Sequence, residues 1–560
     1  MKIILLVGLF VSTALGQFQL QKQSYTTFPS TSQGAKALFS NAAHQASYDP
    51  QERILYVLGA QIAINRPRLL HVVDMFNPAA PSILLTHSMD ASLYGRANDV
   101  QVCGDTVAVS LDSPVPTKEG YVILFTTFRR GDTQLASIGV EPVGVDPKGM
   151  AFTNDCQKLV VANEGRGGLD GSFIDPPGSV SILLRNDLGS PAHVNIGFQS
   201  FIENRETEYQ SRGVRWVYRG DHTAGIVNNM WDDLEPDQVT ISNDQRFAYV
   251  SLPENNAIAR IDINAYSVNE LFGLGLKNWT LFRTDGSDQD GGANLLHHPI
   301  YAMYQPTDIA TATLNGQEYI VSANQGVIKR YAAADGLTNS FDESKRARQI
   351  SLDSDFDQSS WPPTLTTAVS SNQQLGRLLV RESDGRDPIS QRIKDVTAYG
   401  ARSASLWQVQ TMSLAYDTAD ELETKENELY PNTFNGECSN GNQSPLQQRD
   451  LRSDDHGPEP TALAVGMSGT TPLIVVGTRT GAIHLYSDEL LVPRHQSVHR
   501  EGQTTQTWNA LYSANQAGDA IITDVGVINA SDSPNGRVLV WAIGSATGSL
   551  GVYEVSFVRK

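Results

Sequence analysis

The sequence predicts an all-β protein folded as a single β-propeller, with seven blades favoured over eight and with long polar loop insertions. A phrase made of a polar residue, a Pro and an alternating strand begins at Asp146, Glu235, Gln305 and Glu459. Each copy is followed by a second, β-rich strand and then by a third. A unit of three or four strands that recurs at a spacing of more than about 40 residues is typical of propeller blades.

The candidate strands can be assigned to blades in chain order. Asn154-Asp155, Asn315-Gly316 and similar pairs separate the apolar runs, as hairpin turns do. The predicted blades comprise residues 54–60 with 69–75, 100–110 with 120–127, 149–165 with 179–185, 238–263, 301–306 with 319–333, 377–383 with 403–418, and 460–465 with 472–488. Residues 537–558 either form an eighth unit or close the ring with the N-terminal strand.

The first residues have the pattern of a secretory signal peptide. One basic residue, Lys2, precedes an apolar run that ends in small residues before Gln17. This run is too short to span a bilayer comfortably, and no other segment is long and apolar enough to do so. We therefore expect a signal peptide over 1–16, an irregular lead-in over 17–45 that supplies an edge strand, and the propeller over 46–560.

The chain is acidic, with a formal net charge of −19. Such a field repels nucleic acid and anionic lipid and attracts cations. Together with the signal peptide, it predicts a secreted protein that has no nucleic-acid partner and no membrane span.

Cysteines and sequons fit an extracellular chain. Three cysteines suggest one disulfide and one unpaired thiol. Cys103 and Cys156 fall at the first hairpin turns of successive predicted blades, so they are the favoured pair and Cys438 is left over. Sequons, expected to be N-glycosylated after secretion, begin at Asn278, Asn442 and Asn529.

Several long motifs resemble the choice-of-anchor I domain. They follow one another in colinear order over nearly the whole mature chain and include LEPDQVTISNDQRFAYVSLPENNAIARIDI, GMAFTNDCQKLVVANEG, YGARSASLW and SDDHGPEP. The resemblance implies a propeller and secretion or surface display. Because the animal members of this family are mesenchyme-specific cell surface glycoproteins of skeleton-forming cells, it also implies a role in calcified skeleton or shell.

The chain departs from the family pattern at several acidic positions. Gln325 and Val327 stand where family members usually carry Glu and Asp, and Thr461 replaces the acidic residue that follows GPEP. Each departure removes a carboxylate. The resemblance alone therefore does not carry a catalytic metal centre over to this chain.

Two acidic loops offer the hard oxygen ligands that Ca²⁺ requires. Asp285, Asp288 and Asp290 lie on a Gly-rich loop that lacks the later Glu of an EF-hand, so either a calcium loop or a solvated turn is compatible with it. The second loop alternates three carboxylates on one face of an extended segment, at Asp353, Asp355 and Asp357. An exposed acidic loop is the alternative reading there.

A convergent acidic site is expected at one end of the channel, because the inner strands all begin there. The second strands end at the same place, so the acids expected to meet are Glu164, Glu235, Glu254, Asp454, Asp455 and Glu459. They would form a funnel that concentrates cations. Alternatively, these acids cap turns, or Lys148 and Arg166 neutralise them internally.

The sequence contains no recognisable catalytic motif. Gly-x-Ser-x-Gly, HExxH and Cys/His metal spacings are absent, and the eleven histidines are scattered. The favoured function is therefore that of an extracellular matrix component that binds calcium ions or a calcium mineral, with other matrix proteins as further partners. A calcium-dependent phosphatase or phytase-like hydrolase and a protein-binding scaffold are the alternatives.

Overall fold

The computed structural model describes residues 16–59, 68–90, 92–185, 193–221, 225–332, 335, 337, 340–353, 365–382, 386, 390, 392–488 and 492–558. The predicted signal peptide lies outside these residues except for Gly16, and so do Asp355 and Asp357. Within the described part of the chain, no helix is both long enough and apolar enough to cross a bilayer.

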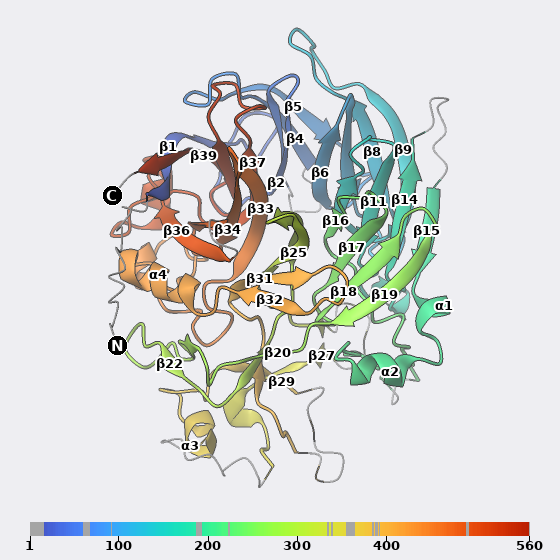
Figure 1. The fold of residues 1–560 in the computed structure, drawn as a ribbon, viewed down its shortest axis with the longest axis vertical. Helices are drawn as coiled ribbons and strands as arrows, with labels where there is room; N and C mark the ends of the chain where they lie inside the picture. Colours follow the sequence, from blue (N-terminus) through green and yellow to red (C-terminus); the bar gives the residue numbers. More distant parts are fainter. Residues whose placement is uncertain are drawn as a thin grey trace, which may run out of the picture.

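Seven four-stranded antiparallel sheets follow one another along the described residues (Figure 1). In hydrogen-bonded order their strands are β2 (Gln45–Asp49), β3 (Ile54–Gly59), β4 (Arg68–Asp74) and β5 (Ser82–Met89); β6 (Ala97–Cys103), β7 (Thr106–Leu111), β8 (Glu119–Thr126) and β9 (Ser137–Val145); β10 (Pro147–Phe152), β11 (Lys158–Asn163), β14 (Ser179–Leu184) and β15 (His193–Gly197); β16 (Val239–Ile241), β17 (Phe247–Leu252), β18 (Ala257–Asp262) and β19 (Ser267–Gly273); β24 (Asp308–Leu314), β25 (Gln317–Asn324), β31 (Ser403–Gln408) and β32 (Leu414–Asp417); β33 (Pro460–Ser468), β34 (Thr471–Thr478), β35 (Ala482–Asp488) and β36 (Pro493–Arg500); and β37 (Ile522–Ile528), β38 (Leu539–Gly544), β39 (Ser549–Val558) and β1 (Gln17–Thr27).

The first strands of these sheets form a closed ring. Strand β2 packs beside β6, and the contacts continue through β10, β16, β24, β33 and β37 back to β2. Radially arranged antiparallel sheets around a central channel define a β-propeller, so the predicted fold class is confirmed.

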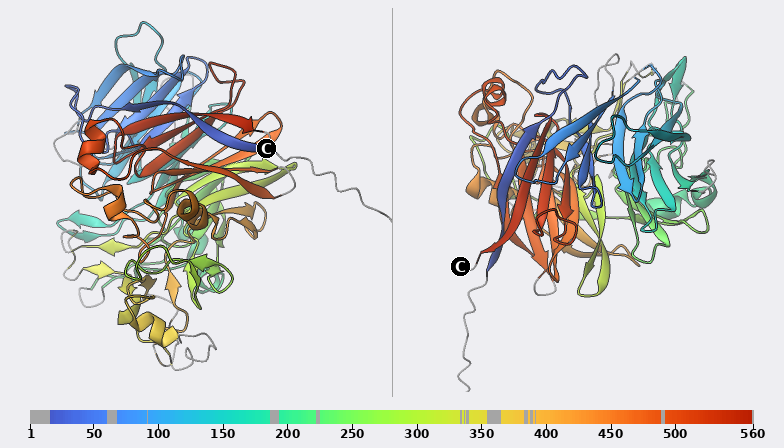
Figure 2. Two further views of the ribbon diagram at one scale, coloured as in Figure 1. Left: turned by 90° about the vertical axis from the view of Figure 1, so that its left-hand side faces the viewer. Right: turned by 90° about the horizontal axis from the view of Figure 1, so that it is seen from above.

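The N-terminal strand closes the ring by joining the last sheet. Strand β1 pairs antiparallel with β39, from Gln17 opposite Val558 to Thr27 opposite Ser549. Both views of Figure 2 show this blue strand beside the red C-terminal strands. Residues 17–45 thus supply an edge strand as expected, and of the two readings of residues 537–558 the structure adopts ring closure.

The assignment of residues 301–418 to two blades was wrong. Strands β25 and β31 are neighbours in a single sheet, with Ile320 opposite Trp407. A long insertion separates them in the sequence, and its short strands, including β29, belong to another sheet. Because the insertion contains strand-like apolar runs of its own, the local pattern could not distinguish them from blade strands.

The remaining elements lie outside the ring: in the view of Figure 1, β20, β22, β29 and α3 are below it, α1 and α2 at its right and α4 at its left. One small sheet joins β20 (Leu276–Asn278), β23 (Tyr301–Met303), β30 (Thr397–Ala398), β29 (Leu379–Arg381) and β28 (Ser344–Arg346). Two-stranded ribbons pair β12 (Gly168–Asp170) with β13 (Ser172–Ile174), β21 (Arg283–Thr284) with β22 (Leu296–His297), and β26 (Arg330–Tyr331) with β27 (Phe341–Asp342). The helices are α1 (Gln199–Ile202), α2 (Glu206–Ser211), α3 (Leu365–Ser370), α4 (Glu421–Leu429) and α5 (Trp508–Ser513).

The apolar core lies between neighbouring sheets. Leu58 and Val72 of the first sheet and Val109 of the second are completely buried in one such layer. Burying each side chain of this kind stabilises the fold by about 1.5–3 kcal/mol. The propeller therefore stands as a rigid frame on which the channel residues are fixed.

Candidate functional site

The polar residues of the repeated phrase lie at one end of the channel. Four antiparallel strands return the chain to the end from which it started, so every inner strand begins at the same end. Pro147 and Pro460 are the first residues of β10 and β33. The residues before the prolines are buried, namely Asp146, Glu235, Gln305 and Glu459.

Three glutamates converge at this end. Glu164 follows β11, Glu254 follows β17, and Glu235 precedes the inner strand β16. One carboxylate oxygen from each lies within 4.8 Å of the other two. The structure therefore brings together the three acids that the strand-end argument places here, and we refer to them as the glutamate group.

Two buried lysines neutralise part of this acidic end. The Lys148 ammonium lies 2.9 Å from Asp146 and 2.7 Å from Glu164. The Lys329 ammonium lies 2.7 Å from Asp233 and 2.9 Å from Glu235. Each lysine thus serves two carboxylates, and Arg96 also lies 3.8 Å from Asp146.

Glu254 is the member of this group that has no lysine partner among the described residues. As a whole residue, Glu254 is only 7% exposed. Burial, followed by repulsion from Glu235 and Glu164, raises the pKa of Glu254 well above its usual value. Arg166 also experiences the field of the three glutamates, although it is exposed. A cation at the glutamate group would relieve this repulsion.

A second acidic group forms between the insertions. Carboxylate oxygens of Asp285, Asp290 and Asp450 lie within 4.8 Å of one another. Burial raises the pKa of Asp285 to about 8, although Asn294 and Ser287 donate backbone hydrogen bonds to its carboxylate. This group would offer Ca²⁺ three ligands, but they are not the three that the loop sequence indicates.

Asp450 takes the place in this acidic group that the sequence predicts for Asp288. The Asp288 carboxylate pairs with Arg377 at 2.7 Å. Asp450 comes from a distant segment in which its spacing to neighbouring acids gives no metal-binding signal. Only the packing of residues 418–457 against the 285–295 loop reveals its position.

Arginines hold the other predicted ligands. Asp454 pairs with Arg346 at 2.9 Å and Arg377 at 3.0 Å, and Asp455 pairs with Arg346 at 2.9 Å. Glu459 pairs with Arg452 and lies 3.5 Å from Arg479. Asp454, Asp455 and Glu459 are not among the carboxylates that lie within 4.8 Å of one another in the glutamate group, so the structure does not bring them into it as the sequence predicts.

The channel contains three aspartates that sequence reasoning missed. Asp99, Asp308 and Asp524 line a cavity of about 750 Å³. Each accepts a hydrogen bond from a backbone N–H of the next inner strand, from Met150 at 2.7 Å, Leu463 at 2.6 Å and Ala46 at 2.7 Å. Asp308 is three residues after Gln305, which begins one of the repeated phrases. Asp99 and Asp524 lie on two other inner strands, β6 and β37. These acids link neighbouring blades.

Stability should fall as the pH rises toward 8, because burial raises the pKa of Asp308 to about 8 and that of Asp99 to about 6. An unfolded aspartate titrates near about 3.9, so between these pH values the folded chain keeps protons that the unfolded chain has lost. Over this pH range, each such group lowers the free energy of unfolding by up to about 1.4 kcal/mol for every unit by which the pH rises. Asp308→Asn keeps a side-chain oxygen that can accept the hydrogen bond from the Leu463 N–H. In this variant the free energy of unfolding should therefore change less with pH, and urea unfolding from pH 4 to pH 8 would measure it.

The control for this measurement is Asp395→Asn, because Asp395 is exposed. Its pH dependence should follow that of the unsubstituted chain. Equal slopes for Asp308→Asn and the unsubstituted chain would contradict the prediction.

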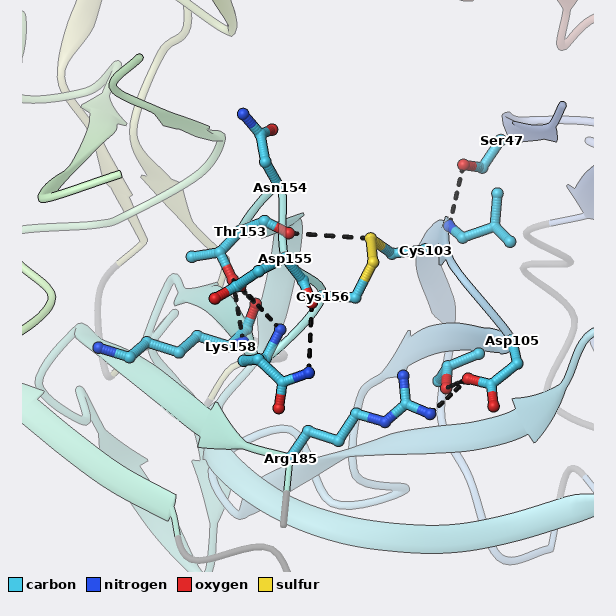
Figure 3. The surroundings of a disulfide bond; sticks show 12 residues. Ser47, Cys103, Asp105, Thr153, Asn154, Asp155, Cys156, Lys158 and Arg185 are labelled. Atoms are coloured by element: carbon cyan, nitrogen blue, oxygen red, sulfur yellow. Dashed lines mark hydrogen bonds and ion pairs between the residues drawn. A yellow bond between two sulfur atoms is a disulfide. The ribbon is translucent and has the colours of Figure 1, made fainter. Parts of the chain in front are cut away.

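Cys103 and Cys156 form the disulfide that the sequence favours, with their Cα atoms 5.6 Å apart (Figure 3). It joins the end of β6 to the turn after β10, at the opposite end of the channel from the glutamate group. Arg185 and Asp105 form an ion pair in the same region. Cys438 is unpaired and buried.

The three sequons differ in how their asparagines are held. Asn442 is exposed. The side-chain Oδ1 atom of Asn278 accepts hydrogen bonds from the N–H and the hydroxyl of Thr280. The Oδ1 atom of Asn529 accepts one from the Met467 N–H. Glycosylation at all three positions stays a prediction, and glycopeptide mass spectrometry of the protein expressed in animal cells would test it.

A family model for the choice-of-anchor I domain matches residues 44–490. Over 342 residues the chain is 29% identical to the mesenchyme-specific cell surface glycoprotein of Strongylocentrotus purpuratus, covering 58% of this chain and 44% of that protein. Over 190 residues it is 30% identical to Gigasin-3a of Magallana gigas, covering 32% of this chain and 64% of that protein. The chain thus matches less than two thirds of the length of these curated relatives.

Solved structures also resemble this chain at low identity. Hydrazine synthase of Kuenenia stuttgartiensis matches with a TM-score of 0.43 and 10% identity, covering 93% of this chain and 96% of that chain. The Cps50 (Swd1) β-propeller domain of Myceliophteria thermophila matches with a TM-score of 0.40 and 7% identity, covering 96% of this chain and all of that domain, 100%.

Proposed function

Because the chain belongs to the choice-of-anchor I domain family, we propose that it is a secreted, acidic glycoprotein of the extracellular matrix that binds calcium ions or a calcium mineral. The name of one relative places that protein at the cell surface, which is consistent with an extracellular location here. The net charge of −19 supports attraction of cations. A role in shell or skeleton formation is part of this proposal.

The glutamate group is the observation that carries the calcium proposal. Ca²⁺ takes six to eight oxygen ligands at about 2.3–2.6 Å, and carboxylates bind it through one oxygen or two. Three carboxylates with oxygens within 4.8 Å of one another can share such an ion. Glu254 is the decisive member, because Lys148 pairs with Glu164 and Lys329 pairs with Glu235, whereas no described lysine pairs with Glu254.

Calcium should stabilise the protein through Glu254. Adding millimolar CaCl₂ to chelator-treated protein should raise the melting temperature, since an ion that binds only the folded state shifts the unfolding equilibrium. Glu254→Gln should lose most of this increase. In the absence of calcium, the same variant should melt at or above the temperature of the unsubstituted protein, because it removes a repelling carboxylate.

Glu203→Gln is the matched control, because Glu203 is exposed. It should keep the full response to calcium. An equal calcium response in Glu254→Gln and the unsubstituted protein would refute the assignment to the glutamate group. Depletion of the protein from solution by calcium mineral would test surface adsorption separately, and hydrolysis of a phosphate ester with and without calcium would test the hydrolase alternative.

A further inference from the structure

A cavity of about 750 Å³ occupies the channel at the end opposite the glutamate group. Figure 3 shows Cys103 and Asn154, which both line it. Asn154, Asn243 and Asp532 stand in the turns that follow the inner strands β10, β16 and β37, and all three are exposed. The cavity is therefore open to solvent at the end of the channel where the disulfide lies. We refer to it as the channel cavity.

The charged side chains that line the channel cavity are all carboxylates. They belong to Asp99, Asp308, Asp524 and Asp532, and no Lys, Arg or His is found among the described residues of the lining. Asp308 and Asp524 are partly exposed, so solvent in the cavity reaches them. Burial raises the pKa of Asp524 well above its usual value, and repulsion from Asp308 and Asp99 adds to this. A cation in the cavity would reduce this repulsion.

The links between blades do not require this negative charge. Thr240 on β16 makes the same kind of link with an uncharged hydroxyl, which accepts a hydrogen bond from the Thr311 N–H of the next inner strand at 3.0 Å. Asp99, Asp308 and Asp524 make their links with carboxylates, which repel one another. A carboxylate can accept about four hydrogen bonds, so in Asp308 and Asp524 the backbone N–H groups leave part of this capacity unused. The unused acceptors favour a ligand with several N–H donors.

The carboxylates of the channel cavity are too far apart to share one metal ion. Among the described residues, three carboxylates lie within 4.8 Å of one another in the glutamate group and in the second acidic group, but not in this cavity. Ca²⁺ needs oxygens that converge to about 2.3–2.6 Å from one point. A guanidinium instead spreads its charge over a planar fork with five N–H donors, which can reach carboxylates on different strands. An extended cation is therefore the better match.

We propose that the channel cavity binds an arginine side chain of a partner protein, which enters from the disulfide end and donates hydrogen bonds to Asp308 and Asp524. Charge complementarity selects this occupant, because the charged side chains of the lining are all acidic and the chain as a whole has a formal net charge of −19. The volume of about 750 Å³ admits a complete side chain together with water. This site is independent of the calcium proposal, because it shares no residue with the glutamate group.

The test is calorimetric titration of the chelator-treated mature protein with the capped peptide acetyl-Gly-Arg-Gly-amide. The comparison is the same peptide with citrulline in place of arginine, because citrulline has nearly the same shape but no charge. We expect one arginine peptide per chain, bound at least about tenfold more tightly than the citrulline peptide and more weakly as NaCl is added. Asp308→Asn and Asp524→Asn should each weaken binding by at least about tenfold, although asparagine still offers an oxygen to the backbone N–H.

Asp395→Asn serves as the control, because Asp395 is exposed and lies outside the cavity lining. It should bind the arginine peptide as tightly as the unsubstituted protein. The proposal is overturned if the two peptides bind equally or not at all, or if both Asp308→Asn and Asp524→Asn keep the full affinity. Binding of spermidine without binding of the arginine peptide would also overturn it, in favour of a free polyamine. Loss of binding in a variant whose circular dichroism spectrum is unchanged would support the proposal over a purely structural role.

Discussion

Replacing Lys329 by Met should lower the free energy of unfolding by about 3–5 kcal/mol. The Lys329 ammonium is 2% exposed and pairs with both Asp233 and Glu235. Methionine fills a similar volume but leaves two buried carboxylates without their cation, which is the costly way to break a buried ion pair. The loss of stability should be smaller at lower pH, because burial raises the pKa of Glu235 to about 7 and this carboxylate is then protonated at pH 5. Urea unfolding at pH 7.5 and pH 5 would measure both effects.

Lys118→Met is the matched control for this substitution. Lys118 pairs with Asp170 at 2.7 Å, but its side chain is 59% exposed. Surface pairs of this kind contribute about 0–1 kcal/mol, so the control should remain close to the unsubstituted protein. A loss in Lys329→Met no larger than in Lys118→Met would show that the acidic end of the channel does not depend on this lysine.

Removing the disulfide with Cys103→Ala and Cys156→Ala together should cost about 2–4 kcal/mol. The two cysteines are 53 residues apart, and the entropy of closing a loop of that length corresponds to about 4 kcal/mol. The bond ties neighbouring blades at the cavity end of the channel, where Cys103 contributes to the lining. Urea unfolding of the double variant under non-reducing conditions is the measurement.

Cys438→Ala distinguishes loss of the bond from loss of a buried sulfur. Cys438 is 6% exposed and packs near Trp508, so its replacement should cost only about 1 kcal/mol. If the double variant were as stable as Cys438→Ala, the disulfide would contribute nothing to holding these blades together.

The fold could be predicted because one physical constraint recurs in the sequence. A Pro lacks an N–H donor and is tolerated at the first residue of a strand, so Pro147 and Pro460 mark where inner strands begin. The same marks place Glu164, Glu235 and Glu254 at one end of the channel. The sheet formed by β25 and β31 could not be predicted, because pairing across a long insertion leaves no local trace.

The rest of the candidate sites depend on packing between distant segments. Asp450 joins Asp285 only through the contact between two insertions. Asp99 looks like an ordinary strand residue until the next inner strand brings the Met150 N–H to it. Conversely, Asp454 and Asp455 have an acidic pattern that their arginine partners neutralise.

The pairing of β1 with β39 has a consequence for how the protein is made. Thr27 finds its partner Ser549 only after more than 500 further residues have been synthesised. At about 5–20 residues per second, β1 waits roughly half a minute to two minutes as an unpaired strand while the other sheets form. During that interval β1 is an unpaired strand to which chaperones or strands of other nascent chains can bind. A chain that is truncated before β39 therefore lacks the strand with which β1 pairs, and its ring cannot close.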